Sequence, residues 1–329
     1  GRNEVARGYT LAANQGLRLT KADYAVLLNS DTIVTDGWLD RMIACGEENP
    51  RYGIVGPLSN TASWQSIPDV EDDGDWAENV LPEGIAVQDV GRLVARYSGR
   101  LYVPMPLLNG FCLCIRRAVL QDISYFDEEN FGRGYGEEDD YILRARKAGW
   151  QPALADDTYV YHAQSRSYSN ERRHRLGKIA GQGLIRKHGA RVIEDGVGFC
   201  RNDRVLQGIR ARSKAMYARN DLIAQGRALY SGRRVLFLLP AMGPSGGVNV
   251  VMDEAHALRE MGVDVNVYNL PGYKARFGRA YPSFPLPVVY GEPAQLVDLA
   301  PEYDAVVATV NTTVPWISAL QVLDFAPVL

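Results

Sequence analysis

Two groups of acidic side chains in this sequence could together bind a cation and accept a proton. The first is Asp31, which closes the segment YAVLLNSD. The second is the run 137–140, four consecutive carboxylates after the glycine-rich segment GRGYG. Carboxylate oxygens suit hard divalent cations, and a carboxylate beside a substrate hydroxyl can take its proton. Each group also has a structural explanation, because Asn-Ser-Asp favours a turn and acids in a first helical turn complement the helix dipole.

The apolar segment 24–28 has to hold Asp31 in place. A short apolar run that ends in polar residues predicts a strand buried on both faces of a parallel sheet. In open α/β sheets, ligands collect beyond the carboxyl ends of the strands. Asp31 would therefore project from a rigid element toward a ligand.

The four carboxylates are predicted to occupy the first turn of a helix over residues 137–148. Gly149 would end this helix, whose last turn contains basic residues. Four adjacent carboxylates repel one another and exceed what the dipole requires, while the preceding glycines let the backbone approach a ligand. A functional role is favoured for the cluster. His162 follows another strand-like run and is either a structural hydrogen-bonding residue or a ligand.

The order of apolar runs and helical patterns favours a layered α/β domain over residues 1 to about 165. Within it, residues 69–89 carry eight acids and no Lys or Arg, which is typical of a solvated loop. Residues 172–219 carry thirteen Lys or Arg against three acids and predict a helical connector. Strands are expected at 24–29, 53–56, 111–115, 153–155 and 158–161, and helices at 4–20, 36–47 and 137–148.

A second α/β unit begins at RRVLFLLPAMGPSGGVNVVMDEAHALREMGVDVNVYNL. Its order of strand, glycine-containing loop, amphipathic helix and strand is the first half of a βαβ fold. The glycines before the helix either make a tight turn or leave its N–H groups open to an anionic or hydroxyl-rich ligand.

The composition excludes several classes of protein. The net charge of −3 gives no pull toward nucleic acid, and no apolar run approaches the ~20 residues that cross a bilayer. The four cysteines form no CxxC pair, so we expect buried free thiols in a reducing cytoplasm. We expect no secretory signal. We also expect a fragment cut at both ends, because the sequence opens without methionine and stops just after a helix-like stretch.

Several motifs in order resemble glycosyltransferase family 2, the inverting nucleotide-sugar transferases with the GT-A fold. The motifs are ARGYTLAANQGLRLTKADYAVLLNSDTIVTDGWLDRM, YGIVGPLSNTAS, LLNGFCLCIRRAVL, FDEENFGRGYGEEDDYILRARKAGW and YVYHAQSRSY. The resemblance covers residue 3 to about 190 and is especially close to rhamnosyltransferase-like enzymes of bacterial surface polysaccharide synthesis.

The resemblance implies roles for individual residues. Asp31 takes the metal position of the family's Asp-x-Asp motif, His162 completes the metal site, and the metal is Mn²⁺ or Mg²⁺. Glu138 is implied as the general base, with Asp139 as its rival. The family's first strand and its nucleotide-gripping turn would precede Gly1. Donor or acceptor contacts are implied for Arg7, Asn29, Asn109, Gly110, Glu137, Asp139 and Asp140.

We therefore expect three parts: a GT-A domain truncated at its N-terminus (1–190), a helical linker (191–232) and a partial Rossmann-like domain (233–329). The last part resembles the amino-terminal half of a GT-B, family 4-like glycosyltransferase. If both resemblances hold, the parent protein is a tandem transferase.

The expected function is metal-dependent transfer of a sugar, with inversion, from a nucleotide-diphosphate donor to a glycan or lipid-linked acceptor. The expected location is the cytoplasm, with peripheral contact to the inner face of the membrane through the basic stretch. The same stretch suits a solvated connector equally well. A sugar nucleotidyltransferase and a non-catalytic glycan-binding module are the alternatives.

Overall fold

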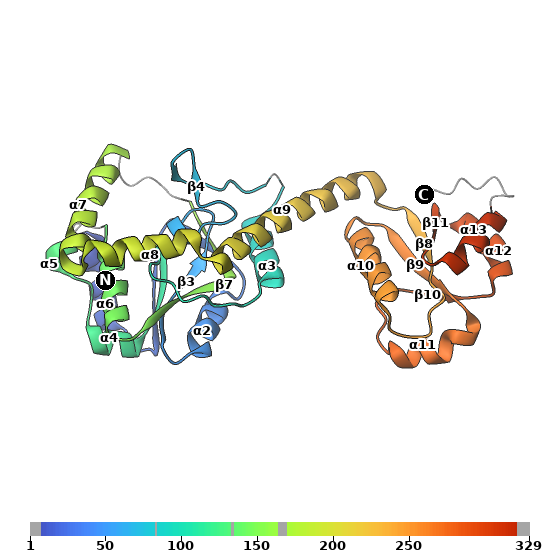
Figure 1. Cartoon of the computed structure of the whole chain (residues 1–329), viewed down its shortest axis with the longest axis horizontal. Helices are drawn as coiled ribbons and strands as arrows, with labels where there is room; N and C mark the ends of the chain where they lie inside the picture. Colours follow the sequence, from blue (N-terminus) through green and yellow to red (C-terminus); the bar gives the residue numbers. More distant parts are fainter. Residues whose placement is uncertain (1–7, 83, 133–134, 164–169, 321–329) are drawn as a thin grey trace. The chain divides into compact units, whose positions relative to one another are not determined.

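The computed structural model describes residues 8–82, 84–132, 135–163 and 170–320. The chain forms two compact units, Gly1–Tyr217 and Ala218–Leu329, and each contains its own β-sheet (Figure 1). Within the described residues, no helix is both long enough and apolar enough to cross a membrane.

The first unit is built on a mixed five-stranded sheet with the order β1-β6-β3-β7-β2. Strands β3 and β7 run parallel, and the other neighbours pair antiparallel. A separate two-stranded sheet, β4 with β5, lies in the acidic segment 69–89. The bounds are β1 Tyr24–Leu28, β2 Thr32–Val34, β3 Tyr52–Leu58, β4 Glu71–Asp72, β5 Asp75–Trp76, β6 Cys112–Arg116 and β7 Gln151–His162.

Both faces of this sheet are covered, because alternate residues of β6 enter two different apolar clusters. Cys112 and Cys114 pack with Met42 and Cys45 of α2, whereas Leu113 and Ile115 pack with the remaining helices. All four cysteines are buried free thiols, as expected. The helices are α1 Tyr9–Leu19, α2 Trp38–Glu48, α3 Val87–Tyr97, α4 Arg117–Ile123, α5 Glu128–Phe131, α6 Glu137–Lys147, α7 Asn170–His188, α8 Ala190–Asn202 and α9 Arg204–Tyr230, with a 3-10 turn η1 Ser63–Gln65.

Strand β1 forms as predicted, but its environment differs from the prediction. It pairs antiparallel with β6 and lies at the edge of the described sheet, with only Ala25 buried and Leu28 exposed. The prediction of a parallel strand buried on both faces is therefore wrong. A five-residue apolar run contains no information on strand direction, which is decided by how the chain connects the strands.

The two strands predicted at 153–155 and 158–161 are one continuous strand, β7. Asp156 and Asp157 lie between them and are buried, but they are satisfied. Asp156 accepts hydrogen bonds from the Tyr102 N–H and the Ser98 hydroxyl, and Asp157 accepts one from the Tyr102 hydroxyl. Because these partners remove the cost of burying two carboxylates, the strand continues, with a register shift against β3.

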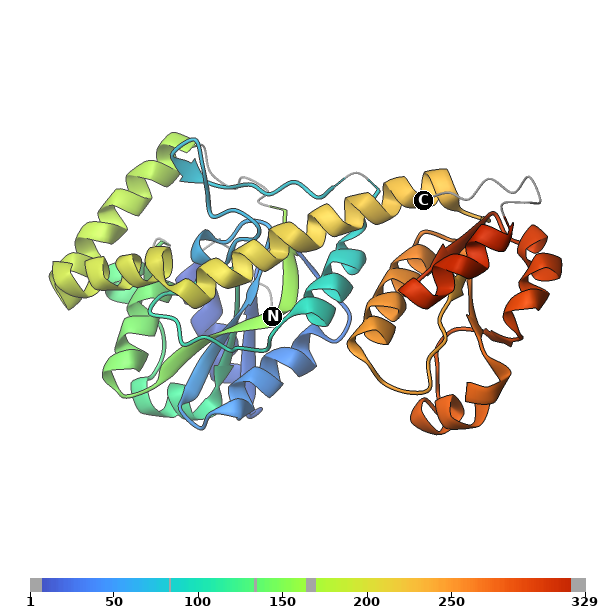
Figure 2. The same cartoon turned by 45° about the vertical axis from the view of Figure 1, so that its right-hand side comes forward.

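The basic stretch 172–219 is largely helical, as predicted, and several of its apolar side chains are buried in the first unit. Cys200 of α8, together with Leu206, Ile209 and Met216 of α9, is buried in that unit's main core. Figure 2 shows α8 and the first part of α9 lying along this unit.

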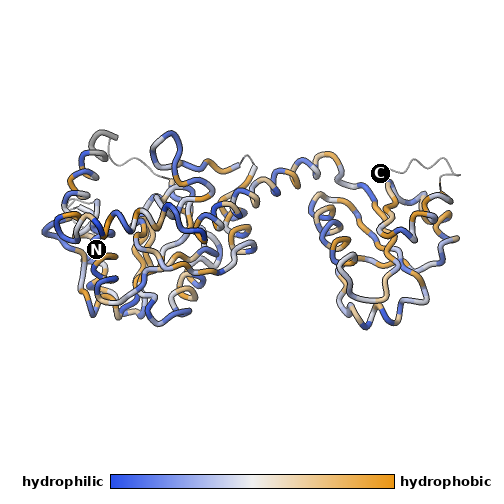
Figure 3. The backbone as a smooth tube through the Cα atoms, in the orientation of Figure 1, coloured by the Kyte–Doolittle hydropathy of each residue, from blue (hydrophilic) through white to orange (hydrophobic). Residues whose placement is uncertain are grey.

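The second unit has a parallel four-stranded sheet with the order β10-β9-β8-β11. Helix α10 covers one face, while α12 and α13 cover the other. Apolar residues concentrate in the strands of both sheets (Figure 3). The predicted strand-helix-strand order is confirmed by β8, α10 and β9. The bounds are β8 Arg234–Leu238, α10 Gly246–Glu260, β9 Asp264–Asn269, α11 Lys274–Ala280, β10 Val288–Tyr290, α12 Leu296–Leu299, β11 Ala305–Ala308 and α13 Val314–Leu320.

Candidate active site

The pairing of β2 with β7 brings Asp31 and His162 together. Thr32 is the register partner of His162, and the Ala163 N–H donates to the Asp31 carbonyl at 2.8 Å. His162 Nε2 consequently lies 3.4 Å from Asp31 Oδ1, although the two residues are far apart in sequence.

The imidazole ring of His162 is held in one orientation. Its Nδ1 lies 3.1 Å from the Thr61 carbonyl oxygen, and the Phe111 ring stacks on it with centroids 5.2 Å apart. Because a carbonyl oxygen can only accept, Nδ1 carries the proton. In the neutral ring, Nε2 then presents its lone pair toward Asp31. A carbonyl that fixes the tautomer in this way is a common partner of metal-binding histidines.

The start of β6 connects this pair to α6. The Asn29 N–H donates to the Phe111 carbonyl at 2.9 Å, and Asn109 Oδ1 accepts the Phe111 N–H at 3.0 Å. A Cβ added at Gly110 would lie 3.2 Å from Glu138 Cβ, so glycine allows the closest approach there. Gly110 therefore lies against Glu138, and both Asn29 and Asn109 are hydrogen-bonded to the residue that follows it, Phe111.

The acidic run occupies the first turn of α6, as predicted. The turn begins at Gly136, whose φ of 86° lies in the left-handed region that glycine tolerates. Within the described part of the chain, one carboxylate oxygen of Glu137 and one of Glu138 are buried without a hydrogen-bond partner. Such groups are costly to bury in a stable fold, and they occur where a ligand supplies the missing partner.

Burial raises the pKa of three of these acids, and mutual repulsion adds to the rise at Glu137 and Asp139. Burial, followed by the charge of Glu138, raises the pKa of Glu137 to about 8. Burial also raises the pKa of Glu138, although backbone N–H groups of Glu138, Gly136 and Gly110 oppose it. The pKa of Asp139 is raised by burial and by Glu138. The three acids interact strongly, so they titrate as a group. A carboxylate whose pKa is moved toward neutrality suits general acid–base work.

Tyr9 is a neighbour of this cluster that the sequence motifs did not single out. Burial raises the pKa of its phenol, and the charges of Glu138 and Glu137 raise it further. Tyr9 lies in the first turn of α1, far from the acids in sequence, and no local pattern marks it. Only the packing of α1 on this unit could reveal it.

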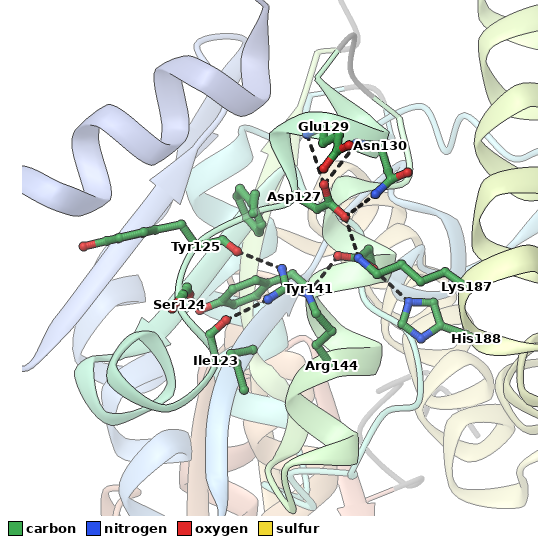
Figure 4. A network of polar contacts seen from close by, with 12 residues as sticks. Ile123, Ser124, Tyr125, Asp127, Glu129, Asn130, Tyr141, Arg144, Lys187 and His188 are labelled. Carbon is green, nitrogen blue, oxygen red and sulfur yellow. Dashed lines mark hydrogen bonds and ion pairs between the residues drawn. The ribbon is translucent and has the colours of Figure 1, made fainter.

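Asp140 differs from its three acidic neighbours because its carboxylate is fully engaged. Its partners Arg144, Lys187 and His188 are labelled in Figure 4. It is completely buried, and its oxygens contact Arg144 Nε at 2.9 Å, Lys187 Nζ at 2.8 Å and His188 Nε2 at 2.8 Å. Lys187 and His188 end α7, so Asp140 ties α7 to the first turn of α6.

Arg144 and Lys187 extend this network to the chain before α6. Arg144 donates to the carbonyls of Ile123 and Tyr125, each at 2.8 Å, and Lys187 Nζ lies 2.6 Å from Asp127 Oδ2. Burial would raise the pKa of Asp127, but the hydrogen bonds from Lys187 and Asn130 outweigh it and lower the pKa. The network holds the acid-bearing turn of α6 in place from two sides.

The predicted site residues thus fall into three sets. Asn29, Asp31, Asn109, Gly110 and His162 are linked to one another through Phe111, and Gly110 joins them to Glu138 of the acidic turn. The contact of Asp140 with donor or acceptor stays a prediction. Its oxygens already bind three side chains. Arg7 lies outside the described residues. The part of the chain that is described contains no group of three or more His, Cys, Asp or Glu side chains able to hold a metal ion.

Several curated proteins are similar in sequence to part of this chain. An uncharacterized protein of Mycobacterium bovis and two of Mycobacterium tuberculosis are each 27% identical over 191 residues, which cover 55% of this chain. The chain spans 66% of the length of these relatives.

Two glycosyltransferases are among the solved structures that are similar. A mannosyltransferase from Pyrobaculum calidifontis, in complex with GDP-Man and Mn²⁺, has 14% identity and a TM-score of 0.38, with 69% of this chain and 61% of that chain covered. GalNAc-T7 with UDP, GalNAc and Mn²⁺ has 14% identity and a TM-score of 0.36, with 65% and 43% covered.

A family-level match covers the whole candidate site. The sequence model described as "Glycosyltransferase like family 2" matches residues 3–181, which include the acidic turn, Asp31 and His162. Since this match spans more than half of the 329 residues, the chain belongs to the glycosyltransferase-like family 2.

Proposed function

We propose that the first unit transfers a sugar, with inversion, from a nucleotide-diphosphate donor to a hydroxyl of a glycan or lipid-linked acceptor. One observation carries the proposal. Gly110 contacts Glu138, while the next residue, Phe111, stacks on His162 beside Asp31. The candidate proton acceptor Glu138 and the candidate cation site of Asp31 and His162 therefore lie on either side of two consecutive residues, Gly110 and Phe111. They do so in a domain of this family.

The pair of Asp31 and His162 fits a divalent cation. A carboxylate oxygen and an imidazole lone pair face each other at 3.4 Å, and the ring proton is on the other nitrogen. Two electron-rich atoms in this arrangement suit a shared cation. Carboxylate and phosphate oxygens accept both Mg²⁺ and Mn²⁺, and the imidazole favours Mn²⁺. A cation held there would offset the negative charge of the leaving diphosphate.

Glu138 is the proposed general base. Its buried oxygen Oε2 has no hydrogen-bond partner within the described residues, so it can receive a proton from the acceptor hydroxyl. As the acceptor oxygen bonds to the anomeric carbon, the bond from that carbon to the nucleoside diphosphate breaks on the opposite face. General-base assistance of this kind contributes roughly 100- to 10,000-fold.

Asn29, Asn109 and Gly110 are proposed to contact the donor or the acceptor, since Gly110 contacts Glu138 and the two asparagines are hydrogen-bonded to the adjacent Phe111. Glu137 and Asp139 are proposed to tune the base through their charges, because each interacts with Glu138. Arg7 is proposed to contact the donor or the acceptor, and this rests on the family resemblance alone.

The setting of the reaction is also proposed. A role in bacterial surface polysaccharide synthesis, in the cytoplasm and at the inner face of the membrane, follows from the rhamnosyltransferase-like resemblance and the basic stretch 172–219. The second unit is proposed to be the amino-terminal part of a GT-B-like domain. Its parallel sheet is compatible with this assignment.

The test is incubation of the chain with UDP-, GDP- and dTDP-sugars and Mn²⁺, with and without EDTA. Release of nucleoside diphosphate that EDTA abolishes supports the proposal. Release of pyrophosphate would favour the alternative, a sugar nucleotidyltransferase. Binding of glycans without any turnover would favour a non-catalytic module.

A further inference from the structure

A cavity of the first unit lies between the segment 64–71 and the helices α8 and α9. Its volume of about 420 Å³ falls in the usual range of ligand sites. Its lining combines an indole ring with paired charges, Trp64, Asp69, Glu71, Arg201, Arg210 and Lys214.

Four of the five charged side chains that line this cavity form two ion pairs. Arg201 Nη2 lies 2.6 Å from Glu71 Oε1, and Lys214 Nζ lies 2.6 Å from Asp69 Oδ1. Both pairs are half exposed, so they offer donors and acceptors to a ligand without an excess of either charge. The fifth charged group, Arg210, donates to the backbone carbonyls of Trp64 and Cys200 at 3.0 and 3.2 Å. The one excess positive charge, that of Arg210, is therefore already hydrogen-bonded to the backbone, so the pattern fits a neutral polar ligand better than an anion.

The aromatic part of the lining is held by its neighbours. The Trp64 ring meets the Trp76 ring edge to face, with centroids 4.8 Å apart, and the Arg201 guanidinium lies 5.7 Å from the Trp64 centroid. Aromatic rings fixed in this way present a rigid apolar surface. A sugar ring has an apolar face of C–H groups and a rim of hydroxyls, and these match an indole surrounded by charged hydrogen-bonding groups.

The wall of the cavity also touches the candidate active site. Asn109 Nδ2 donates to Ser63 Oγ at 3.1 Å, and the Asn109 N–H donates to Gln65 Oε1 at 2.5 Å. The turn η1 therefore carries Trp64 on the cavity side and contacts Asn109, the neighbour of Gly110, on the other. The carbonyl of Thr61, two residues before this turn, contacts His162.

A second link runs through α8. Gly196 of α8 lies close to Pro106 and Leu107, since a Cβ added at Gly196 would be 3.5 Å from either side chain, and these residues shortly precede Asn109. The carbonyl of Cys200, on the same helix, accepts the hydrogen bond from Arg210 in the cavity wall. Two independent chain segments connect the cavity with the site of the proposed reaction.

We propose that this cavity binds an uncharged sugar residue of the glycan acceptor, next to the residue whose hydroxyl is glycosylated. The proposal rests on the proposed function, and it names the chemical class of the acceptor. Trp64 would carry the apolar face of the sugar, and the pairs Arg201–Glu71 and Lys214–Asp69 would bond its hydroxyls.

The test compares two arginines of the same helix, α8. Arg201 lines the cavity, whereas Arg191 pairs with Asp195 on the exposed surface. Binding of methyl glucoside, galactoside, mannoside and rhamnoside to the whole chain is measured by saturation-transfer NMR, without nucleotide sugar. We expect Arg201→Ala to weaken the binding about tenfold, as the loss of one charge-assisted hydrogen bond would, and Arg191→Ala to leave it unchanged. Trp64→Leu, checked for folding by circular dichroism, should also weaken it.

Three results would overturn the proposal: no glycoside binding by the unmodified chain, equal binding by the Arg201 and Arg191 variants, or displacement of the glycoside by inorganic pyrophosphate. Binding of nucleotide sugars with Mn²⁺ is measured in parallel. Its absence, with glycoside binding intact, would count against the transferase proposal and not against the sugar site.

Discussion

His162 Nε2 lies 3.4 Å from Asp31 Oδ1, while the opposite nitrogen of the same ring contacts the Thr61 carbonyl. The geometry turns the basic nitrogen of the ring toward a carboxylate. It is produced by the antiparallel pairing of β2 with the end of β7, so two elements of the sheet fix it.

The first prediction concerns this pair. Asp31→Ala and His162→Gln should each weaken Mn²⁺-dependent nucleotide binding by more than about tenfold, since each removes one of the two proposed ligands and even the loss of an orienting contact around a metal site costs about 10- to 100-fold. Isothermal titration with UDP and GDP in the presence of Mn²⁺ measures this. Asp36→Ala is the control, because its side chain is 79% exposed and pairs only weakly with Arg92. Unchanged binding in both site variants would rule out the proposed metal pair.

The second prediction concerns the network in Figure 4. Asp140→Asn should lower the free energy of unfolding by about 3 to 5 kcal/mol, because it removes the buried counter-charge of Arg144 and one of the two carboxylates that pair with Lys187. Asp195→Asn removes an exposed ion pair with Arg191 and should cost less than about 1 kcal/mol. Urea unfolding followed by circular dichroism compares the two. Equal, small losses would show that the network does not hold α6 and α7 together.

The third prediction concerns pH. Folding raises the pKa of Glu137 from its ordinary value to about 8, so the folded chain retains a proton that the unfolded chain has lost. The free energy of unfolding should therefore fall as pH rises from about 4.5 to 8. Asp127 has the opposite shift, but its contribution is complete above its ordinary pKa and adds no slope in this window.

Glu137→Gln should flatten the dependence and make the chain more stable than the unmodified protein at pH 8.5. Urea unfolding at pH 5.5 and 8.5, with EDTA present, provides the comparison. An equal change in the free energy of unfolding between pH 5.5 and 8.5 for the two proteins would mean that burial does not raise the pKa of Glu137.

Much of the fold and part of the site could be predicted from the sequence. The helix over residues 137–147 is confirmed, because its acidic first turn and basic last turn mark both ends locally. The family 2 assignment of the first unit is confirmed by the match to residues 3–181. The rhamnosyl specificity and the GT-B-like assignment of the second unit remain predictions.

Other features depend on contacts between distant segments, which no local pattern contains. The direction of β1 is determined by its pairing with β6. Tyr9 reaches the acids only through the packing of α1. Asp140 is one of four consecutive acids and looks no different from its neighbours in the sequence. Its carboxylate is engaged because it binds the end of α7, nearly fifty residues later.

The central claim is that Glu138, and not Asp139, takes the proton from the acceptor. Comparing variants of these two acids tests it most directly. Single-turnover transfer and donor binding are measured for Glu138→Gln and Asp139→Asn, in a chain that turns over a nucleotide sugar. If Glu138 takes the proton, Glu138→Gln should slow transfer by roughly 100- to 10,000-fold with donor binding nearly intact, and Asp139→Asn should slow it much less. Near-normal transfer by Glu138→Gln would contradict the account, and a collapse confined to Asp139→Asn would assign the base to Asp139 instead.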